Sequence, residues 1–139
     1  MLDNERVAIF NNLPEIEVSW RELFLDPNNP RLHSGSEPPY NTSGDEGVAL
    51  VKRKDPDLRE QMGEFNIDDL MKPMGEKGFV YRGIPAMLVK KLSEDCYLVL
   101  EGNRRLTAIK KLMDDHHSGQ KPLAARVLES FERMKVVDC

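Results

Sequence analysis

The most constraining feature of this sequence is a change of hydrophobic period at Gly102. Residues 96–102 (CYLVLEG) form a short Leu- and Val-rich run, typical of a buried strand, and the apolar residues after the glycine recur at helical spacing. These recurring residues are Leu106, Ile109, Leu112 and Met113. Glycine permits the tight turn that such a junction needs. The sequence therefore predicts a strand–glycine–helix corner, with a helix from Asn103 to about Asp115.

Similar apolar patterns elsewhere predict further elements. Period-two alternation and Leu- and Val-rich runs indicate strands, whereas apolar residues three and four apart indicate helices. The further predicted strands are residues 16–20, 83–92 and 123–130, with a polar turn at Ser93, Glu94 and Asp95. The further predicted helices begin at Asp55 and Pro56, with Asp55 as the cap, and at about Asn66, with Gly75 and Gly78 closing the second. Residues 131–138 predict the start of a helix or a strand. Because the predicted elements include both strands and helices, the predicted fold class is mixed α/β.

Composition limits the class of protein further. The 139 residues are 40% hydrophobic and 32% charged, which is typical of one globular domain. No apolar run approaches the roughly 18 residues of a membrane span, and no signal peptide is recognised. The two cysteines, Cys96 and Cys139, favour free thiols and a cytoplasmic location. The net charge of −4 argues against a domain that grips DNA through its overall charge.

The chain also divides into regions by composition. Residues 1–14 are expected to be an N-terminal lead-in, and residues 15–139 a single domain. The segment at about 33–47 is rich in Gly, Ser, Pro and acidic residues, which is typical of a surface loop.

Two arginines oppose the electrostatics of the predicted helix. Arg104 and Arg105 lie in its first turn, where the macrodipole favours anions. Arg105 also projects within the apolar arc of roughly 120° that faces the core. Because a buried guanidinium without an anion costs several kcal/mol, an anion must lie close. Glu101 could supply it as an internal ion pair, or a bound phosphate could supply it at the helix N-terminus.

The stretch EGNRRLTA, Glu101 to Ala108, resembles the nucleotide-binding motif of the ParB/sulfiredoxin-like superfamily, which reads G-E-R-R-x-x-A in partition proteins and E-G-N-R-R-L-x-A in related domains. Upstream, LDPNNPR at Leu25–Arg31 and KGFVYRGIPAMLV at Lys77–Val89 resemble further segments of the family in the same order. The three segments cover most of the chain from Val18 to Val127.

This resemblance implies a small α/β domain that binds a nucleoside triphosphate, ATP or CTP, with Mg²⁺ arriving on the nucleotide. The residues it assigns to phosphate or nucleotide binding are Gly102, Asn103, Arg104, Arg105, Thr107, Arg31 and Gly78. Asn103 is expected to bind a phosphate oxygen or cap the helix, and Glu101 is the candidate catalytic residue for hydrolysis or phosphoryl transfer. No protein metal site is predicted.

The resemblance also leaves alternatives open. The family includes DNA-associated partition proteins and nuclease-like proteins, so a DNA partner through a separate region, a homodimer and a role as the front part of a longer protein are all consistent with it. A non-catalytic interaction module with an internally paired arginine corner is the alternative. The sequence departs from the partition pattern at Asn103, which replaces a Glu, in the long gap from Gly78 to Pro85, and in having no helix-turn-helix after Val127.

Overall fold

The computed structural model describes residues 13–33, 35–79 and 86–139. The chain forms a five-stranded mixed sheet with strand order β1-β5-β3-β4-β2. Its strands are β1 (Glu15–Val18), β2 (Leu23–Leu25), β3 (Leu88–Ser93), β4 (Cys96–Glu101) and β5 (Met134–Asp138). Pairs β1–β5 and β3–β4 are antiparallel, whereas β3–β5 and β2–β4 are parallel. The predicted mixed α/β class is confirmed.

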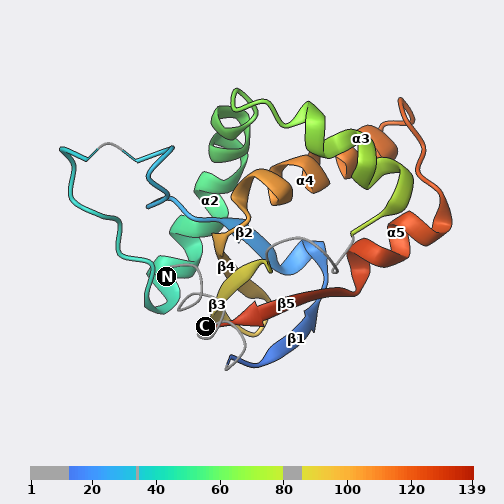
Figure 1. Ribbon diagram of the computed structural model, residues 1–139. Helices are drawn as coiled ribbons and strands as arrows, with labels where there is room; N and C mark the ends of the chain where they lie inside the picture. Colours follow the sequence, from blue (N-terminus) through green and yellow to red (C-terminus); the bar gives the residue numbers. More distant parts are fainter. Residues whose placement is uncertain (1–12, 34, 80–85) are drawn as a thin grey trace, which may run out of the picture.

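The helices lie around this sheet, and α3, α4 and α5 gather above it in Figure 1. They are α2 (Gly44–Met62), α3 (Asp68–Lys77), α4 (Asn103–His117) and α5 (Ala125–Glu132), with a 3₁₀ helix η1 at Trp20–Glu22. Among the described residues, none of these helices has the length and apolarity that crossing a membrane requires.

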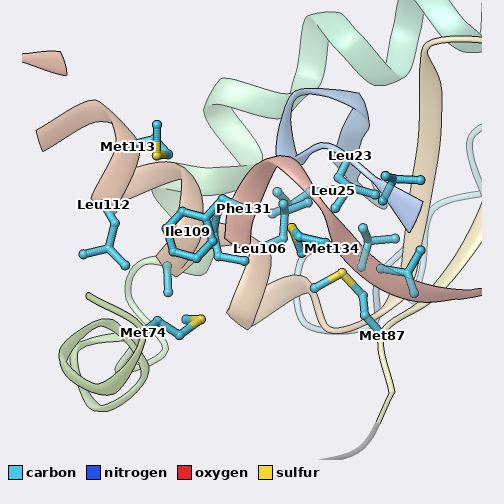
Figure 2. Close-up of a cluster of buried hydrophobic side chains, with 14 of the residues drawn as sticks. Leu23, Leu25, Met74, Met87, Leu106, Ile109, Leu112, Met113, Phe131 and Met134 are labelled. Carbon is cyan, nitrogen blue, oxygen red and sulfur yellow. The ribbon is translucent and has the colours of Figure 1, made fainter. Parts of the chain in front are cut away.

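One face of the sheet carries the main core (Figure 2). Its largest fully buried side chains include Phe131 of α5, Leu106 and Ile109 of α4, and Leu25 of β2. The predicted apolar stripe of α4 is confirmed, because all four of its members are buried. Methionine fills much of the remaining space, as Met74, Met87, Met113 and Met134 show in Figure 2.

Helix α2 covers the open edge of the sheet at β2. Its N-terminal half packs through Val51 against Cys96 and Leu98 on one face, and its C-terminal half joins the main core through Leu58 and Met62. The helix thus passes from one face of the sheet to the other, beside the short strand β2. This path carries the residues of its middle turns past the edge of the sheet, where α4 also lies.

The β-hairpin and the helix after Gly102 are where the sequence predicted them. Strands β3 and β4 pair around the turn at Glu94 and Asp95, and α4 begins at Asn103 and ends two residues beyond the expected Asp115. Helix α3 ends at Gly78, as predicted, whereas Gly75 lies inside it. Residues 83–85 of the predicted strand and residues 1–12 of the predicted lead-in lie outside the described residues.

Three predicted elements are wrong. The helix assigned to begin at Asp55 begins at Gly44, so the polar loop ends at Ser43 and Pro56 lies inside α2. Trp20 belongs to η1, not to a strand, because Ser19 and Glu22 form a capping box around it. Residues 123–130, predicted as a strand, contribute most of α5, and the strand that follows is β5.

Candidate functional site

Gly102 makes the corner between β4 and α4 and has φ +109°, in the left-handed region. A Cβ atom here would lie 3.0 Å from Cγ of Met87 and 3.2 Å from a guanidinium nitrogen of Arg105. The backbone conformation and the close packing both favour glycine. The corner therefore brings the start of α4 directly against the end of β4.

The start of α4 is an electropositive end of a helix. Its first ladder bond runs from the N–H of Leu106 to the carbonyl of Gly102, at 2.9 Å. The N–H groups of the three preceding residues thus come before the helical ladder, and no acidic residue lies in the first turn. Arg104 and Arg105 add their own positive charge to this end.

Asn103 fixes the corner from inside. It is 4% exposed, its Nδ2 donates to the carbonyl of Val99 at 2.9 Å, and its Oδ1 accepts from the N–H of Asp26 at 3.0 Å. These bonds join the ends of the neighbouring parallel strands β2 and β4. The side chain therefore neither caps α4 nor turns to a ligand, and the expectation of a phosphate contact is restricted to its backbone N–H.

Arg105 is a half-buried cation for which the described residues supply no hydrogen-bonded or ionic partner. Within the described residues, its guanidinium makes no hydrogen bond and has no carboxylate oxygen within 4 Å. Burial lowers the pKa of Arg105, and the nearby charge of Glu101 acts in the opposite direction. Glu101 is exposed and does not close the predicted ion pair. The internal anion expected for Arg105 is therefore not provided by Glu101.

Arg104 is half-buried and tied on one side to the turn between α2 and α3. One of its terminal guanidinium nitrogens donates to the carbonyl of Asn66 at 2.9 Å, while its Nε is buried and has no hydrogen-bond partner among the described residues. A guanidinium offers five N–H donors, so Arg104 retains donors for a second acceptor.

A cleft of about 380 Å³ opens beside these arginines. Its lining includes six of the eight predicted site residues: Arg31, Glu101, Gly102, Asn103, Arg104 and Arg105. Met62, Leu70 and Leu100 supply an apolar part of the wall, and Asn29 lies next to Arg31. The cleft thus combines three arginines, one exposed carboxylate and a helix N-terminus.

The other two predicted residues lie elsewhere. The hydroxyl of Thr107 donates to the carbonyl of Asn103 at 2.9 Å, and Thr107 lines a different cleft of about 470 Å³ beside Arg59. Gly78 has φ +81° and packs against α5, where a Cβ would lie 2.3 Å from Oγ of Ser130. Their positions indicate roles in the fold, and neither lines the arginine cleft.

A buried ionic cluster under the sheet edge was missed by the sequence analysis. Lys110 of α4 is 5% exposed, and its Nζ lies 2.9 Å from Oδ2 of Asp55, which is 3% exposed. Nε of Arg59 lies 3.1 Å from the same oxygen, and the N–H of Leu25 donates to the other one at 2.8 Å. Lys110 follows Leu106 by four residues and lies beside the core-facing arc of the predicted helix, and that position is the signal that could have found it.

No protein-family model, curated protein or solved structure matches the chain. The resemblance to the ParB/sulfiredoxin-like superfamily thus stands on the sequence motifs alone.

Proposed function

We propose that this protein binds the phosphates of a nucleoside triphosphate in the arginine cleft at the start of α4. The observation that carries the proposal is Arg105, a half-buried cation at the positive end of a helix with no acidic partner among the described residues. Arg31 and Arg104 line the same cleft. A polyanion is the ligand class that would satisfy these charges together.

Phosphate suits the groups that line the cleft. Backbone N–H groups at a helix N-terminus bind anions, and the planar guanidinium fork matches phosphate oxygens. The volume of about 380 Å³ is within the range of small-molecule sites, about 300–1,000 Å³. Mg²⁺ would accompany the phosphates, since it usually keeps several waters and binds through substrate phosphates and one or two carboxylates.

Glu101 is the proposed acidic group of the site. It is exposed at the cleft, at the end of β4. Its carboxylate would accept a hydrogen bond from a water molecule beside the phosphates, or bind the accompanying Mg²⁺. Asn103 stands where the partition proteins of the superfamily have a Glu, so Glu101 is the proposed substitute for that carboxylate. Glu101→Gln would then remove turnover while leaving phosphate binding in place.

The superfamily interpretation adds a wider context to this proposal. A cytoplasmic nucleotide-dependent switch associated with DNA transactions, dimeric or part of a longer protein, is the biological role that it favours. The net charge of −4 argues against DNA binding through the overall charge of this domain, so the proposed role places DNA contacts in a separate region or in a local basic patch.

Thermal unfolding with and without ligands tests the proposed binding. We expect tripolyphosphate and the four nucleoside triphosphates, with Mg²⁺, to raise Tm by several degrees, because a ligand at 100 times its Kd adds about 2.7 kcal/mol of stability. Arg105→Ala should abolish this rise. Arg133→Ala is the matched control, because Arg133 is an exposed arginine paired with Glu17 and Glu129, and it does not line the cleft.

A Tm that no phosphate ligand changes would favour the alternative, a non-catalytic interaction module. If no phosphate compound moves Tm at millimolar concentration, and Arg105→Ala lowers the stability of the unliganded protein, the arginine corner is structural. A salt-dependent gel shift on duplex DNA separates the DNA-associated alternative, since phosphate-driven binding weakens steeply with salt.

A further inference from the structure

Phe65 is the exposed large hydrophobic side chain of the described residues, at 38% exposure. It lies in the turn between α2 and α3, where its N–H donates to the carbonyl of Met62 at 3.0 Å. Its ring is therefore held on a short, backbone-bonded turn and still reaches solvent.

Two contacts join this turn to the arginine cleft. Arg104 donates to the carbonyl of Asn66, the residue after Phe65. The guanidinium carbon of Arg31, another cleft residue, lies 5.5 Å from the centre of the Phe65 ring. Met62, at the other end of the turn, lines the cleft itself. The Phe65 ring therefore contacts Arg31, which lines the cleft, while Phe65 itself is not part of the lining.

The contact between Arg31 and Phe65 is of a kind that a phosphate can replace. A cation on the face of an exposed aromatic ring is held weakly, whereas a guanidinium–phosphate pair is a charge-assisted and often bidentate hydrogen bond. No carboxylate within the described residues holds Arg31, so its guanidinium is free to exchange one partner for the other. Exchange would uncover one face of the ring.

From these contacts we infer that Phe65 stacks on the base of the bound nucleotide. This inference rests on the proposed function. The cleft arginines are proposed to bind the phosphates, and Phe65 is inferred to bind the base. Arg31 leaves the ring for the phosphates, and the base takes the uncovered face. Stacking on an aromatic ring is tolerant of sequence because every base has a π-face, so all four nucleoside triphosphates use it.

Comparing nucleotides with tripolyphosphate tests the inference, because tripolyphosphate has phosphates and no base. Calorimetric titration of the full chain would give Kd for each ligand with the wild type, Phe65→Ala and Phe65→Tyr. We expect Phe65→Ala to weaken the four nucleoside triphosphates by roughly 5- to 100-fold and tripolyphosphate by less than about 2-fold. Phe65→Tyr, which keeps the ring, should retain wild-type affinity for both ligand types.

Each other outcome is informative. An equal loss for nucleotides and tripolyphosphate in Phe65→Ala would show that Phe65 acts only through the position of Arg31, and would overturn stacking. Unchanged affinity for every ligand would also overturn it, while leaving phosphate binding intact. A wild-type protein that binds neither nucleotides nor tripolyphosphate would refute the proposed function itself. Circular dichroism of the variants checks that this exposed position has not altered the fold.

Discussion

Two cations of α4, Lys110 and Arg105, differ in the carboxylate partners that the described residues supply to them. Lys110 is 5% exposed and has Asp55 at 2.9 Å, whereas Arg105, five residues earlier, is half-buried and has no carboxylate oxygen within 4 Å among the described residues. Burial lowers the pKa of both groups, and a nearby acid opposes the shift in each case, Asp55 for Lys110 and Glu101 for Arg105. Lys110, the more buried cation, thus has a carboxylate within hydrogen-bonding distance, and the described part of the chain supplies none to Arg105.

The difference follows from the path of α2. This helix crosses the β2 edge of the sheet and brings Asp55 between Leu25 and Lys110, where both carboxylate oxygens are hydrogen-bonded. In the part of the chain that the structure describes, no equivalent acid is brought to Arg105, because Glu101 lies at the end of β4 and is exposed. The charge of Lys110 is thus compensated by a carboxylate of the protein, whereas no carboxylate of the described residues lies within 4 Å of Arg105.

The largest effect is expected from Asp55→Ala. It leaves Lys110 buried without its anion, removes the acceptor for the N–H of Leu25, and takes a partner from Arg59, so unfolding free energy should fall by about 3–5 kcal/mol. Urea denaturation at neutral pH measures this loss. Asp114→Ala is the control, because Asp114 meets Arg59 at the surface and should matter by less than about 1 kcal/mol.

A double variant that removes both Asp55 and Lys110 provides a further test of the buried ion pair. Asp55→Ala combined with Lys110→Met removes both buried charges and should recover part of the lost stability. If Asp55→Ala lowers the free energy of unfolding no more than Asp114→Ala does, Asp55 does not stabilise the buried Lys110, and the contrast between Lys110 and Arg105 fails.

Arg105→Met is expected to have a smaller effect of opposite sign. The substitution removes a cation from the positive end of α4 and keeps an unbranched side chain, so the unliganded protein should gain about 0.5–1 kcal/mol. The same urea measurement, made without phosphate in the buffer, gives the value. A clear loss of stability would mean that Arg105 has an internal partner in solution, and the contrast with Lys110 would fail.

Asp26→Asn is expected to have the smallest effect, and a pH-dependent one. Burial raises the pKa of Asp26 above 3.8, and the N–H of Asn28 and the charge of His33 oppose that shift. Among residues 13–33, 35–79 and 86–139, no Lys or Arg forms an ion pair with Asp26 as Lys110 does with Asp55. Between pH 3.8 and the raised pKa of Asp26, the folded protein binds more protons than the unfolded chain, so stability falls as pH rises through this window.

The asparagine variant removes that cost and keeps an acceptor for the N–H of Asn28. It should be more stable than the wild type at neutral pH by less than about 1 kcal/mol, since solvent reaches the carboxyl group. The gain should disappear as pH falls below 3.8. Denaturation at a series of pH values measures the difference, and a gain that persists at low pH would contradict burial as its cause.

Local patterns predicted the parts of the fold in which neighbours along the chain make the contacts. The hairpin of β3 and β4, Gly102 and the apolar face of α4 all depend on residues within a few turns of one another. The bounds of helices were predicted wrongly where the residues in contact are far apart in the sequence, or where an apolar pattern was divided between two predicted elements. Val127 and Phe131 are an i, i+4 pair on the buried face of α5. Residues 123–130 and 131–138 were predicted as separate elements, so this helical spacing was not recognised.

Asp55 illustrates the other kind of error. An Asp before a Pro is a common helix start, but the Asp55 carboxylate bonds to β2 and α4, and the helix begins eleven residues earlier at Gly44. For the candidate site, the sequence grouped six residues that line one cleft, because five are consecutive. It did not find Phe65, whose link to Arg31 spans 34 positions of the chain.

The sequence by itself determined the strand–glycine–helix corner and placed two arginines at its positive end, because backbone conformation and helical period are set by adjacent residues. Only the tertiary structure decided which polar partner each cation received from the protein. Asp55 reaches Lys110 across 55 positions, and Arg104 reaches Asn66 across 38, so these partners depend on how α2 packs against the sheet and α4. Electrostatic pairing over such separations follows from packing, which no local pattern encodes.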